Sequence, residues 1–282
     1  MKTMIVLLAG VLLLSGCANI FDSNYLGAFD APPALDAASY TSMDPTTLIG
    51  DVNSAIKNSD PTFFNQLKGD ATALKNVQDN LAAEMNKTAV TPAERTAQAN
   101  AAKAFIAVTA NSTETLAVAN LAVPELLKLA APGGASGTTD PAALAKGFFQ
   151  GMTDAEVTST LESMLSISTA MSTLSAATDS STDFLSGTSS GDVTQVGVIA
   201  AAATALMSCA GEDLTTPEGK AAAALKVVNM LNDPDPTAYA TANFTGLDSE
   251  ISKLTSALDP TQTPDPKYAY LGDLGLSSLL GQ

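Results

Sequence analysis

The feature that most constrains the fold of this chain is a recurring signal for the start of a helix. A residue that can accept a hydrogen bond at a helix N-cap is followed directly by proline at Asp44-Pro45, Asp60-Pro61, Thr91-Pro92, Asp140-Pro141, Thr216-Pro217 and Asp235-Pro236. Proline fits the first helical position because its missing N–H group would have no partner there in any case. The repeated signal therefore predicts a chain built from successive helices.

The spacing of apolar residues agrees with these starts. One face of a helix would carry Leu48, Ile49, Val52, Ala55 and Ile56, and a later face would carry Val157, Leu161, Met164, Leu165, Met171 and Leu174. No comparable stretch alternates apolar and polar residues with the period of a strand. The predicted fold class is all-α, either an irregular multi-helix bundle or a solenoid-like array of helical hairpins, with about eight to ten helices.

The expected helices cover residues 45–58, 61–87, 92–111, 114–131, 141–150, 154–177, 192–209, 217–232, 236–243 and 247–258. Pro124 should kink or split the fourth of them, because proline removes a backbone hydrogen bond inside a helix. The helix from Val193 to Met207 is apolar almost all round, which predicts a place at the centre of the packing. The Gly/Ser/Thr-rich stretches 132–139 and 179–191 are expected to be loops.

The N-terminal residues have the pattern of an export signal. Lys2 precedes an apolar run from Met4 to Leu14, and small residues follow before Cys17. The apolar run has about 11 residues, whereas a helix that spans a bilayer needs roughly 20. A permanent membrane span is therefore not expected here.

Leu14-Ser15-Gly16-Cys17 resembles the lipobox of bacterial lipoproteins. The resemblance implies that lipid is attached to Cys17, that residues 1–16 are removed, and that the acylated Cys17 holds the protein at a membrane. In the enterobacterial sorting pattern an Asp after the cysteine retains the protein in the inner membrane. Ala18 stands here, which implies the outer membrane, facing the periplasm or the cell surface. The alternative is an ordinary signal peptide with a chance cysteine.

The expected organisation has four parts. Residues 1–16 are the signal peptide, 17–43 an acylated cysteine with a flexible tether, 44–258 an all-helical domain, and 259–282 a C-terminal extension. The extension contains an apolar segment from Tyr268 to Leu280. That segment would either pack back onto the helices or dock on a partner.

Charge and composition exclude several functions. The net charge of −16 makes nucleic-acid binding improbable, because a negative surface repels phosphate backbones. The chain has no histidine, so the commonest general base and metal ligand is missing. Acylation of Cys17 would leave Cys209 as the one thiol, and its place after an apolar helix predicts a buried, unreactive side chain. We expect no cofactor, no metal and no disulfide.

Two catalytic motifs occur in contexts that do not suit them. Gly187-Thr188-Ser189-Ser190-Gly191 has the spacing of a nucleophile elbow, but that turn needs a preceding strand and a histidine partner. Ser54-Ala55-Ile56-Lys57 has the spacing of serine acyl-enzymes, whose other motifs are absent. The acidic pairs Glu212-Asp213 and Asp233 with Asp235 are expected to lie in solvated turns.

A second resemblance concerns the helical body. Ala224, Val228, Leu231 and Pro236 have the spacing found in the second helix of a tetratricopeptide repeat, as in helical-repeat accessory lipoproteins of transporters. The sequence thus predicts a non-enzymatic, membrane-anchored binding or assembly subunit with a protein partner in the cell envelope. The alternatives are a solute-binding accessory lipoprotein that takes a small apolar ligand, and an enzyme that uses carboxylates alone. A groove lined by Phe, Met and Tyr would favour the solute-binding alternative.

Overall fold

The computed structural model describes residues 37–58, 61–130, 141–178, 190–258 and 262–274, and over these ranges the chain is an all-α multi-helix bundle without strands. The predicted fold class is confirmed. The helices are α2 (Ala37–Ser42), α3 (Pro45–Lys57), α4 (Pro61–Gly69), α5 (Ala71–Met85), α6 (Pro92–Ser112), α7 (Thr115–Ala130), α8 (Pro141–Phe148), α9 (Asp154–Ala177), α11 (Ser190–Ser208), α12 (Pro217–Asn232), α13 (Pro236–Asn243), α14 (Leu247–Leu258), the 3-10 helix η1 (Pro266–Tyr268) and α15 (Tyr270–Asp273).

The helix starts follow the sequence closely. Each of the six predicted prolines is the first residue of its helix. Thr91 and Thr153 both form complete capping boxes, in which the threonine side chain accepts from the backbone three residues on and the glutamate there reaches back. These local interactions fix where α6 and α9 begin.

The prediction of one helix over residues 61–87 was wrong, because the helix is interrupted at Asp70. Asp70 has an extended backbone, and its Oδ1 accepts hydrogen bonds from the N–H groups of Thr72 and Ala73 at 3.0 and 2.9 Å. It is therefore the N-cap of a new helix, and Gly69 ends the previous one. Pro124 was predicted to kink or split the fourth helix, and α7 runs through that position without a split. One missing backbone bond leaves the rest of the helix intact.

The tether predicted for residues 17–43 ends earlier than expected, because Ala37–Ser42 forms α2. Tyr40 is buried, and the side-chain amide of Asn80 in α5 donates to the carbonyls of Tyr40 and Met43 at 2.9 and 2.8 Å. The helical body therefore includes Ala37 onward. Residues 18–36 of the predicted tether lie outside the described ranges.

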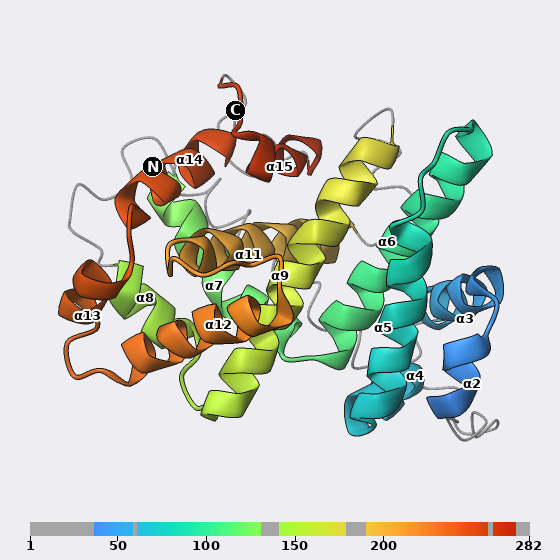
Figure 1. Cartoon of the computed structure of the whole chain (residues 1–282), viewed down its shortest axis with the longest axis horizontal. Helices are drawn as coiled ribbons and strands as arrows, with labels where there is room; N and C mark the ends of the chain where they lie inside the picture. The colour runs from blue at the N-terminus through green and yellow to red at the C-terminus, as the bar shows by residue number, and fades with distance from the viewer. Residues whose placement is uncertain (1–36, 59–60, 131–140, 179–189, 259–261, 275–282) are drawn as a thin grey trace, which may run out of the picture.

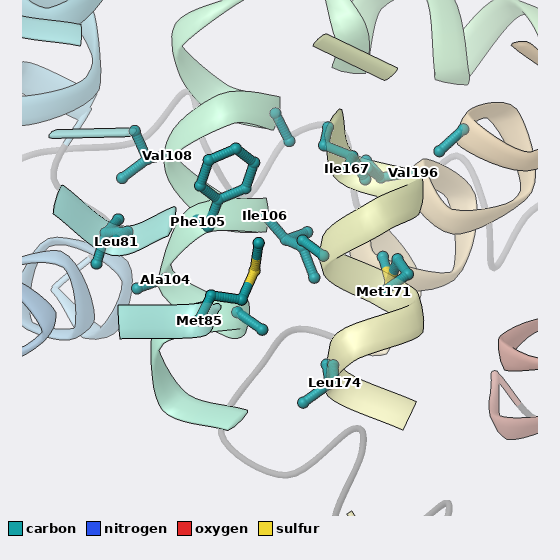
Figure 2. Close-up of a cluster of buried hydrophobic side chains, with 14 of the residues drawn as sticks. Leu81, Met85, Ala104, Phe105, Ile106, Val108, Ile167, Met171, Leu174 and Val196 are labelled. Carbon is teal, nitrogen blue, oxygen red and sulfur yellow. The ribbon is translucent and has the colours of Figure 1, made fainter. Parts of the chain in front are cut away.

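One hydrophobic core is centred on α6, which lies between α5 and α9. In Figure 2, Leu81 and Met85 of α5 lie on one side of Ile106, and Ile167, Met171 and Leu174 of α9 lie on the other. α2, α3 and α4 close the outer side of this core (Figure 1). We call this set of buried side chains the α6 core.

A second hydrophobic core lies at the other end of the molecule, among α7, α8, α12, α13 and the first half of α9. We call it the α12 core. Helix α11 belongs to both cores: Ala200 and Ala201 lie in the α6 core, Ile199 and Ala203 lie in the α12 core, and Ala202 packs against both. The central position predicted for this helix is confirmed. None of the described helices has the length and apolarity needed to cross a membrane.

The described part of the C-terminal extension packs back onto the helices. This was one of the two alternatives that the sequence left open. Tyr268, Tyr270, Leu271 and Leu274 are all buried. A Cβ atom on Gly197 of α11 would lie 2.7 Å from a methyl group of Leu274, so a larger residue there would require the Leu274 side chain to shift.

Candidate functional site

Among the described residues, those that the sequence singled out for chemistry are not gathered into one site. Cys17, the predicted lipid attachment point, lies outside the described residues. Cys209 is 4% exposed, and its burial raises the pKa of its thiol, with the nearby Glu250 carboxylate acting in the same direction. The predicted burial of Cys209 is confirmed, and a buried thiol with a raised pKa is a poor nucleophile.

The two motif matches fall at the ends of helices or outside the described residues. Ser190 and Gly191 are the first residues of α11, while Gly187, Thr188 and Ser189 fall outside the described ranges. Ser54 and Lys57 are exposed in the last turns of α3, and the Ser54 hydroxyl accepts a hydrogen bond from Asn58.

The paired carboxylates hold turns and helix ends. Glu212 forms an ion pair with Lys226 at 2.6 Å, and Asp213 accepts hydrogen bonds from the backbone and hydroxyl of Thr215. Asp233 accepts from the Asp235 N–H group, and Asp235 caps α13. Within the described ranges no three acidic or cysteine side chains gather as a metal site would require.

A pocket of about 400 Å³ lies at the edge of the α12 core, where the end of α8, the loop 149–153, the start of α9 and the end of α12 meet. These elements lie together at the lower left of Figure 1. The inner wall is apolar: Phe149, Val157, Val228 and Leu231 are buried, and Met152 is half-buried. The pocket thus has the concave apolar wall that small ligands require.

Four exposed polar side chains complete the lining of the pocket: Lys146, Gln150, Asp154 and Asn232. The Nζ atom of Lys146 donates to the carbonyl of Asp233 at 3.3 Å. The amide of Asn232 donates to the Oδ1 atom of Asp154 at 3.0 Å. Both interactions join the end of α12 to the opposite side of the pocket, and so they fix the position of one positive and one negative group.

The loop between α8 and α9 shapes one side of the pocket. Gly151 has a φ angle of 88°, a conformation that side chains with a Cβ rarely adopt. Thr153 then caps α9 two residues later. The sequence did not predict the pocket, because Val228, Leu231 and Asn232 approach from a helix more than 70 residues away in the chain.

A separate cluster of perturbed ionisable groups surrounds Glu250 of α14. Lys267 and Tyr268 both donate to the Oε1 atom of Glu250, and Lys253 donates to Oε2. Burial opposes ionisation of Glu250, but these three hydrogen bonds outweigh it and lower its pKa to about 2. The pKa of Tyr268 is raised by burial and by its carboxylate acceptor. We call this set the Glu250 cluster.

The Glu250 cluster fastens the C-terminal segment to the bundle. Lys267 also donates to the Ser208 hydroxyl at 2.9 Å, so the segment is tied to the end of α11 as well as to α14. Tyr268 is fully buried, and its hydroxyl is satisfied by Glu250. Because its polar atoms already bond one another, the cluster serves packing, and the pocket beside α12 is the better candidate site.

Comparisons of the chain with protein-family models, with curated protein sequences and with solved structures found no match.

Proposed function

We propose that this protein is a bacterial lipoprotein, held at the outer membrane by lipid on Cys17, whose helical body acts as a non-enzymatic binding or assembly subunit in the cell envelope. The observation that carries the proposal is Leu14-Ser15-Gly16-Cys17, directly after a short apolar run. Several acyl chains on one residue anchor a protein stably, whereas a single chain would bind only marginally. The partner is a protein of the envelope.

The anchor is tested by growing cells with a palmitate analogue and comparing the parent with Cys17→Ser. The parent should incorporate the label and fractionate with membranes, and Cys17→Ser should lose both properties because a hydroxyl does not replace the thiol in acyl transfer. Cys209→Ser is the matched control, since it removes the other cysteine of the chain. Equal label in the parent and in Cys17→Ser would overturn the lipoprotein proposal.

The assembly role is tested by mild cross-linking of intact cells that produce the tagged parent, followed by purification under denaturing conditions. A defined envelope protein should be recovered in constant ratio to the parent. The Cys17→Ser variant is the comparison: reduced recovery would show that the anchor places the domain beside its partner. Recovery of no specific adduct at several cross-linker lengths would argue against an assembly subunit.

A second candidate function is a helical solute-binding accessory lipoprotein of a transport system, and the pocket beside α12 supports it. Its lining includes Phe149 and Met152 together with the aliphatic side chains of α9 and α12. A mainly apolar wall with a few fixed polar groups is the common form of a small-molecule site. Deletion of the gene should then reduce uptake of the solute by intact cells.

A further inference from the structure

We propose that the pocket beside α12 binds a free apolar α-amino acid, with the ligand carboxylate at Lys146, the ligand ammonium at Asp154, and its side chain against Phe149, Val157 and Leu231. This inference rests on the second candidate function above and names the chemical class of its solute. Three observations carry it.

The first observation is that the pocket presents opposite charges whose partners are neutral. The Lys146 ammonium donates to a backbone carbonyl, and the Asp154 carboxylate accepts from a side-chain amide. These partners orient the two groups but do not cancel their charges. A zwitterion would supply the missing countercharge to each of them.

The second observation is the shape and chemistry of the wall. Ligand pockets run from about 300 to 1,000 Å³, so a pocket of about 400 Å³ suits a small molecule. Phe149, Val157, Val228 and Leu231 supply apolar surface deeper than the charged rim. A ligand whose charged end meets the rim and whose aliphatic or aromatic end meets the wall satisfies both parts.

The third observation is the net charge of the protein, −16. The field of such a surface repels simple anions, including fatty acids, and attracts cations without discrimination. A zwitterion has no net charge, so this field neither repels nor concentrates it. Local recognition by Lys146 and Asp154 can then decide binding.

Saturation-transfer NMR on the purified full-length protein in detergent micelles tests the proposal with three probes: L-leucine, L-leucinamide and N-acetyl-L-leucine. Leucine should bind with a Kd on the order of a millimolar, as a small ligand at a partly exposed site would. Leucinamide lacks the carboxylate and N-acetyl-leucine lacks the ammonium. Each should bind roughly three- to five-fold more weakly, the range for one solvent-exposed charge interaction.

Two variants assign the charges. Lys146→Met should remove the preference for leucine over leucinamide, and Asp154→Asn should remove the preference for leucine over N-acetyl-leucine. Lys57→Met and Asp51→Asn are matched controls, because they remove the same charges from exposed positions on α3. Thermal unfolding of all four variants shows whether the fold is kept.

Absence of saturable leucine binding up to about 20 mM, well above the expected Kd, would overturn the inference. The inference would also be overturned if the Lys146 and Asp154 variants kept the same preferences among the three probes as the parent. These failures are distinct from failure of the function on which the inference rests. Binding is measured on purified protein, whereas the transport role is measured as uptake by cells that lack the gene.

Discussion

The two cores of this molecule use similar side chains but differ in how they are closed. The α6 core is covered by segments that fold back over it, α2 on one side and the C-terminal segment 266–274 on the other. Each of these segments is fixed by a buried or half-buried polar group, Asn80 in the first case and Glu250 in the second. The α12 core has an open pocket at its edge, bordered by exposed Lys146 and Asp154.

Binding capacity in a helical bundle depends on where covering segments are absent. At the α6 core, apolar surface that could receive a ligand is already occupied by Tyr40, Tyr268 and Tyr270 of the same chain. At the pocket, Phe149 and Leu231 keep contact with open space. Complete covering of the α6 core favours stability, and incomplete covering of the α12 core leaves a candidate binding site.

The largest expected effect comes from Ala201→Asp in α11, which would break the element common to both cores. Ala201 is completely buried, and a charge placed there would cost several kcal/mol of desolvation against a net stability of about 5–15 kcal/mol. The variant should be unfolded or strongly destabilised in thermal melts. Ala83→Asp, on the exposed face of α5, should melt close to the parent.

Removing an aromatic ring from the α6 core should lower stability more than removing one from the pocket at the edge of the α12 core. Tyr270 is 1% exposed and fully enclosed, so Tyr270→Ala should cost about 3–5 kcal/mol in chemical denaturation. Phe149 is 8% exposed and lines the pocket, so Phe149→Ala should cost less, about 1–3 kcal/mol. Equal losses would mean that the pocket is as tightly packed as the α6 core.

The Glu250 cluster predicts an acid-sensitive component of stability. The pKa of Glu250 is about 2 in the folded protein against an ordinary value of 4.5. A lowered pKa stabilises the fold above about pH 4.5, and this stabilisation is lost as the pH falls through 2. Glu250→Gln should lower the free energy of unfolding at pH 7 by about 1–3 kcal/mol, since it removes hydrogen bonds to a charged acceptor.

The measurement is urea denaturation of the parent and of Glu250→Gln between pH 7 and pH 2. The two should converge as the pH falls, because other carboxylates titrate equally in both. A constant difference between them at every pH would contradict the role assigned to the Glu250 charge.

Two asparagine substitutions should have small effects that differ between α2 and the pocket. Asn80→Ala removes two hydrogen bonds that hold α2 and should cost about 1–2 kcal/mol. Asn232→Ala removes one exposed hydrogen bond at the pocket and should cost less than about 0.5 kcal/mol. Differential scanning fluorimetry of the pair should show the larger shift for Asn80→Ala, and the reverse order would undermine the proposed fixing of α2.

Local signals in the sequence located most of the helices. Asp-Pro and Thr-Pro pairs fix the first residue of six helices because the proline and the preceding side chain act within one turn. The break at Asp70 also had a local signal, a glycine followed by an N-cap residue. α2 had none, since Tyr40 is held by Asn80, forty residues away in the chain.

The same distinction applies to the sites. The burial of Cys209 followed from the apolar helix before it. The Glu250 cluster, in contrast, joins α14 to the C-terminal segment that follows it, and no spacing rule in the sequence connects Glu250 with Lys267 and Tyr268. The pocket depends on where α12 ends relative to α8 and α9. Tertiary packing alone determines that relation, so the sequence predicted only the kind of lining to look for.

Because α11 contributes to both cores, the molecule should behave as a single cooperative unit rather than as two separable halves. A fragment that ends before Ser190 would lack the helix against which α7 and α9 pack, and a fragment that begins there would expose the apolar surface of α11. Truncations meant to map a binding region would then report loss of folding as loss of binding. Point variants that leave α11 intact are the appropriate tools for dissecting this protein.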